Sequence, residues 1–178
     1  MEIKLDSKLF KAVNGLLLFA IALIMMINSI GWLIGLFAMF GAFALCAAWF
    51  FDGKKDCKLA TTAAIYFLFS IVFFAKEGIA FDQFFFGLWA VLEGALLVFA
   101  GLKAKEEKDN LWIVALCLGA MAILFGFIGS FLIASAELSG SFGSGLSLKM
   151  KMSPVSGLAM LFVALGYIFP FCKSFLKK

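Results

Sequence analysis

The residue in this sequence with the clearest capacity for chemistry is Glu93, a single carboxyl in the middle of an apolar stretch. The stretch covers about residues 84–102, so Glu93 stands nine residues from each end. At 1.5 Å per helical residue, the carboxyl lies about 13 Å from either edge. A charged group at that depth in a bilayer costs a few kcal/mol or more, and such groups usually mark ion, proton or substrate paths.

The sequence gives Glu93 no charge partner, because no Lys lies at that depth in any apolar stretch. Desolvation then disfavours the ionised carboxyl, and we expect a protonated acid at neutral pH. Candidate hydrogen-bond partners near the same depth are Tyr66, Ser70 and Tyr167. Two interpretations stay open: a neutral Glu93 that holds helices together, and a proton- or ligand-binding site.

Other chemistries find little support in the sequence. All fifteen basic residues are Lys, so the chain has neither the bidentate guanidinium of Arg nor the general base and metal ligand that His provides. No nucleophile–base pair or Gly-rich phosphate loop is present, and we expect a non-enzymatic protein without a cofactor. The four cysteines are spaced too widely for a metal site, and we expect no disulfide between Cys46, Cys57, Cys117 and Cys172.

The rest of the chain predicts the elements that must position Glu93. The mean hydropathy is +1.10 and 65% of the residues are hydrophobic, against about half in soluble domains. Six apolar stretches have about the length that crosses the hydrocarbon of a bilayer. We therefore expect an all-α polytopic membrane protein with a single transmembrane domain, whose spans cover about 10–27, 32–51, 59–75, 84–102, 111–133 and 154–172.

The lysines fall in alternate gaps between these stretches. Twelve of the fifteen lie in the N-terminal segment, in 52–58, in 103–110 and in the C-terminal tail. By the positive-inside rule, both termini are cytoplasmic. The six spans then form three helical hairpins that each start and end inside. The lysines mark membrane edges, so the net charge of +4 does not indicate a nucleic-acid partner.

One connection, 134–152, is long and rich in Gly and Ser, and we expect it to be an external loop. Apolar and polar residues alternate over 146–152, which is typical of a short strand or an interfacial segment. Ser153 and Pro154 resemble a capping residue and a first helical residue, so we expect the sixth span to begin there.

Glycines recur on one face of several spans. Helices in lipid associate where small residues allow their backbones to approach closely, so we expect helix packing at these positions. The alternative is a narrow substrate path lined by glycines. The residues concerned are Gly31, Gly35, Gly87, Gly94, Gly119 and Gly126.

A Gly-Leu pair opens the second helix of each expected hairpin, at Gly35, Gly87 and Gly157, and further glycines follow at Gly41 and Gly94. This pattern, over most of residues 13–171, resembles the HdeD-like family of small bacterial membrane proteins. The resemblance implies a six-helix protein of the bacterial inner membrane, linked to acid or other stress tolerance. The bilayer is the expected partner, and a homo-oligomer or a partner membrane protein stays open.

A second hypothesis is a small transport component. It would be either a substrate-binding membrane subunit, similar to those of energy-coupling-factor transporters, or a proton-coupled carrier that uses Glu93.

Overall fold

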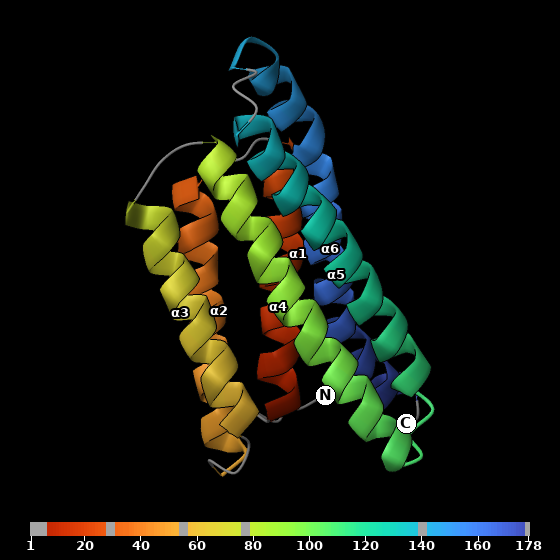
Figure 1. Cartoon of the computed structure of the whole chain (residues 1–178). Helices are drawn as coiled ribbons and strands as arrows, with labels where there is room; N and C mark the ends of the chain where they lie inside the picture. Colours follow the sequence, from red (N-terminus) through yellow and green to blue (C-terminus); the bar gives the residue numbers. More distant parts are fainter. Residues whose placement is uncertain (1–6, 28–30, 54–56, 76–78, 139–141, 177–178) are drawn as a thin grey trace.

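The computed structural model shows six α-helices, and no strand among the residues that it describes (Figure 1). Those residues are 7–27, 31–53, 57–75, 79–138 and 142–176. The expected all-α fold is confirmed. The helices are α1 Ser7–Ile27, α2 Gly31–Phe51, α3 Cys57–Ala75, α4 Ile79–Glu106, α5 Trp112–Leu138 and α6 Phe142–Leu176.

The helices have the lengths and surfaces of a membrane bundle. Helices α1 to α5 each contain a segment long and apolar enough to cross a bilayer, and α6 contains a shorter apolar segment, Pro154–Pro170. Large apolar side chains point outward around the bundle; Leu16 and Phe131, for example, are 61% and 60% exposed. Soluble proteins rarely expose such a continuous apolar surface, which here faces lipid. The expected helical membrane protein is confirmed.

The segment 134–152 differs from the prediction. Helix α5 continues to Leu138 and α6 already begins at Phe142, so the backbone is helical on both sides of 139–141. Pro154, expected as a first helical residue, lies inside α6, as does Pro170. A helix satisfies its own backbone hydrogen bonds, whereas a strand needs a partner. The glycines there cost a helix only about 1 kcal/mol each.

The helices pair mainly as α4 with α5, α1 with α6, and α2 with α3. Helices α1 and α2, and α5 and α6, also pack together, and α4 makes a smaller contact with α6. Helices α3 and α4, expected to form the middle hairpin, contact each other at few points. Figure 1 shows them close at one end and spread apart at the other, with α1 seen through the gap.

The start of α1 and the end of α6 lie at the end of the bundle where α3 and α4 spread apart (Figure 1). We call it the lysine end, because six of the described lysines lie there: Lys8, Lys11, Lys58, Lys103, Lys105 and Lys108. Two turns connect helices at this end. The first contains Gly53 with a φ of 69°, and the second contains Lys108 with a φ of 58°.

Candidate functional site

Glu93 is fully buried on α4 and belongs to a group of polar side chains from four helices. The hydroxyl of Tyr167 on α6 donates a hydrogen bond to Glu93 Oε2 at 3.1 Å. Asn14 on α1 donates through Nδ2 to the hydroxyl of Tyr66 on α3, at 3.2 Å. The Tyr66 hydroxyl also interacts with Tyr167 and Glu93. We call Asn14, Tyr66, Glu93 and Tyr167 the polar cluster.

The polar cluster has hydrogen-bonding capacity that its own members do not use. Glu93 Oε1 and Asn14 Oδ1 are buried without a hydrogen-bond partner in the described part of the chain. The Trp89 indole, one turn before Glu93 on α4, lies near the carboxyl, but Trp89 Nε1 does not reach hydrogen-bond geometry and is also unpartnered. Each buried polar atom left without a partner costs about 1–3 kcal/mol. The cluster is therefore suited to a proton or to a small polar ligand.

The partners expected from the sequence are placed differently from one another. Tyr167 bonds Glu93 directly, and Tyr66 is joined to the same cluster. Ser70 is buried one turn beyond Tyr66 on α3, and no hydrogen bond between described residues joins it to Glu93. Asn14 and Trp89 were not identified from the sequence as neighbours of Glu93. The signal for Asn14 was its amide inside the first apolar stretch, as unusual there as the carboxyl of Glu93.

The expected packing glycines lie mostly at close helix contacts. A Cβ on Gly94 would lie 2.8 Å from the carbonyl oxygen of Gly119, and a Cβ on Gly119 would lie 2.7 Å from that of Gly94. Gly87 and Gly126 face each other in the same way. We call these four residues the glycine seam between α4 and α5.

The other two expected glycines lie on α2. Gly35 packs against the backbone of α3 at Ser70. Gly31 begins α2, but its surroundings fall outside the described residues.

Aromatic side chains pack on the side of the polar cluster that faces away from the lysine end. Trp89 packs edge-on against Tyr66, with ring centroids 4.8 Å apart, and stacks on Phe69 at 5.5 Å. Phe73 and Phe86 complete this aromatic cluster around the indole. All five side chains are buried. They join α3 to α4 on the side of Glu93 away from the lysine end.

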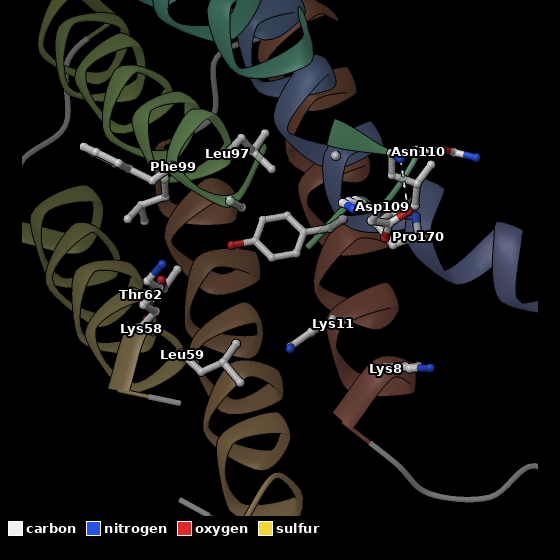
Figure 2. A pocket seen from close by; sticks show the side chains of 16 residues that line it. Lys8, Lys11, Lys58, Leu59, Thr62, Leu97, Phe99, Asp109, Asn110 and Pro170 are labelled. Carbon is white, nitrogen blue, oxygen red and sulfur yellow. Dashed lines mark hydrogen bonds between the residues drawn. The ribbon is translucent and has the colours of Figure 1, made fainter. Parts of the chain in front are cut away.

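On the other side of Glu93, a pocket of about 970 Å³ opens at the lysine end between α1, α3, α4 and α6 (Figure 2). It is lined on three helices by residues one turn below members of the polar cluster, namely Lys11 below Asn14, Thr62 below Tyr66, and Leu97 below Glu93. One turn is about 5 Å along the helix axis. Tyr167 itself lines the pocket. Its side chain therefore connects the pocket to the Glu93 carboxyl.

No protein-family model matches this chain, and neither a curated protein nor a solved structure matches it.

Proposed function

We propose that this protein is a small transport component of the bacterial inner membrane, a carrier in which Glu93 takes up and releases a proton. One observation carries the proposal: Tyr167 lines the pocket and donates a hydrogen bond to Glu93. A carboxyl in mid-membrane that is connected to a pocket can exchange its proton with one side of the membrane. Intramembrane acids of this kind commonly belong to proton or substrate paths.

The asymmetry around Glu93 supports this function. The pocket approaches the carboxyl from the lysine end, while the aromatic cluster around Trp89 blocks the route to the other end. A carrier needs a central site that is open to one side at a time. The arrangement corresponds to the state that is open at the lysine end.

The proposed orientation places the lysine end, and with it the pocket, in the cytoplasm. It rests on the positive-inside rule and on the lysines at this end. Cys57 is exposed at the start of α3 and can report the side. With Cys46, Cys117 and Cys172 replaced by Ser, a membrane-impermeant maleimide should label Cys57 in inverted vesicles and not in intact cells. Labelling in intact cells would reverse the orientation.

The alternative is the HdeD-like function that the sequence pattern implies, a non-enzymatic bundle linked to stress tolerance in which Glu93 only holds helices together. It stays a prediction. A purely structural glutamic acid needs no path to water, and the pocket that ends at Tyr167 favours transport.

Infrared spectroscopy of the purified protein tests the proposal. The carbonyl stretch of a protonated carboxylic acid is assigned to Glu93 by its loss in Glu93→Gln. We expect this band to shift within seconds of transfer to D2O and to titrate with pH, because the pocket leads to Tyr167. Tyr167→Phe should move the band, whereas Glu106→Gln, which changes an exposed carboxyl, should not. A Glu93 band that ignores both D2O and pH would make the residue structural.

A further inference from the structure

The pocket carries an excess of positive charge that the proton site does not use. Four lysines and one carboxyl line it, which are Lys8, Lys11, Lys58, Lys108 and Asp109. At this end of the bundle Lys103 pairs with Glu107, and both lie outside the pocket. Lys8, Lys11 and Lys108 have no carboxylate partner among the described side chains. The rim therefore has the charge of an anion-binding site.

Three of the lysines line the pocket from different helices or turns and can share one anion. Figure 2 shows Lys11 extending toward Leu59 at the base of α3, where Lys58 also lies, while Lys8 points away. Lys108 approaches from the turn between α4 and α5 and holds a left-handed backbone conformation, with a φ of 58°. That conformation costs a residue with a side chain about 1 kcal/mol relative to glycine.

The pocket is also open to the side, toward lipid. Helices α3 and α4 have few contacts, and they spread apart near the lysine end (Figure 1). Phe99 and Ala100 on α4 line the pocket and are exposed, Phe99 by 62%. Leu59 and Leu96 continue the apolar wall inward. A water-soluble anion would gain nothing from this apolar side opening, whereas the acyl chain of a lipid can pass through it.

We propose that the pocket binds an anionic phospholipid of the surrounding bilayer. Its phosphate lies among Lys11, Lys58 and Lys108, and one acyl chain follows Leu59 and Phe99 through the gap between α3 and α4. The lysines stand at the helix ends, the level at which headgroups lie. The bound lipid closes the side of the pocket where α3 and α4 have few contacts. This site does not depend on proton binding at Glu93.

Lipid retention measured by native mass spectrometry tests the charge requirement. The full chain in detergent is titrated with phosphatidylglycerol or with phosphatidylcholine of the same chain length. We expect phosphatidylglycerol to bind more tightly, and Lys11→Gln with Lys58→Gln to weaken it about 25-fold, at roughly fivefold per lysine.

The matched control removes the same charge from the same end of the bundle, through Lys103→Gln with Lys105→Gln. Lys103 pairs with Glu107, Lys105 lies 5.0 Å over the Trp112 ring, and neither lines the pocket. Binding should stay within about twofold of the unaltered protein, well under the fivefold per lysine expected inside the pocket. An equal loss in both double variants would show general surface attraction and overturn the proposal.

Two further measurements address the acyl chain. Ala100→Trp should fill the side opening and abolish phosphatidylglycerol binding, while Ala120→Trp, on the exposed surface of α5, should not. Melting temperatures of both variants verify that they are folded. Soluble glycerol phosphate should compete poorly. Full lipid binding by Ala100→Trp, or equal affinity for glycerol phosphate, would refute a lipid site. Glu93→Gln should bind lipid normally, so this proposal and the proton proposal fail separately.

Discussion

Helix α4 meets its two neighbours in the chain in opposite ways. It packs against α5 through the glycine seam, where a Cβ on Gly94 or on Gly119 would come within 2.8 Å of the other helix's backbone. Against α3 it has rings near one end, led by Trp89 on Phe69, and a pocket near the other. The two interfaces of α4 thus differ in the distance between backbones, in the size of the side chains between them, and in whether a pocket opens there.

The difference shows what holds helices together in lipid. Two apolar surfaces gain little from leaving lipid for each other, so stability depends on close packing of backbones and small side chains. Gly94 allows such packing with α5. Large rings on α3 and α4 pack between these two helices near one end, and the pocket lies between them toward the other end. A functional site can therefore lie between α3 and α4 without weakening the close packing of α4 on α5.

The largest effect should come from the seam. Gly119→Ala puts a methyl group against the carbonyl oxygen of Gly94, and overpacking of this kind costs about 1–3 kcal/mol. Ala120→Val adds two methyl groups at the neighbouring exposed position and should change the free energy of unfolding by under about 0.5 kcal/mol. Denaturant unfolding in detergent measures both. Similar losses for the two variants would mean that the seam is not the tight interface.

An intermediate effect should appear in the turns at the lysine end, where Gly53 and Lys108 share a left-handed conformation. Lys108→Gly should raise the unfolding free energy by about 1 kcal/mol, because the strain of a side chain there is removed. Gly53→Ala should lower it by a similar amount. Thermal unfolding checks the pair, and phosphatidylglycerol binding should fall for Lys108→Gly even as stability rises. A Lys108→Gly variant that is less stable would contradict this account.

The smallest effect should come from the open interface. Ala100→Leu places a larger side chain in the gap beside α3, where the pocket has room for it. The unfolding free energy should change by under about 0.5 kcal/mol. The same measurement on Gly94→Leu, also on α4, gives the contrast, because that side chain has no room. A large loss for Ala100→Leu would mean that α3 and α4 close on each other in the membrane.

The sequence was informative where a single helix carries the signal. Apolar length predicted the six helices, and the depth of Glu93 within its stretch singled it out. Pairing between distant helices was not predictable, because the contact of α1 with α6 depends on surfaces from opposite ends of the chain. For the same reason Asn14, which reaches the polar cluster from α1, and the pocket were missed. The helical backbone of 142–152 was not predicted, because its Gly and Ser content was taken to indicate a loop. These residues disfavour a helix only weakly.

The contrast between the two faces of α4 has a mechanical consequence. Helices α4 and α5 are locked by their backbones into one stiff lever, while α2 and α3 form another, since Gly35 packs on the α3 backbone. The two levers touch mainly through aromatic rings rather than through their backbones. Tyr66 belongs to one lever and Glu93 to the other. A small rocking of one lever against the other would change the surroundings of the Glu93 carboxyl directly, and we expect the position of the levers to be coupled to the proton on Glu93.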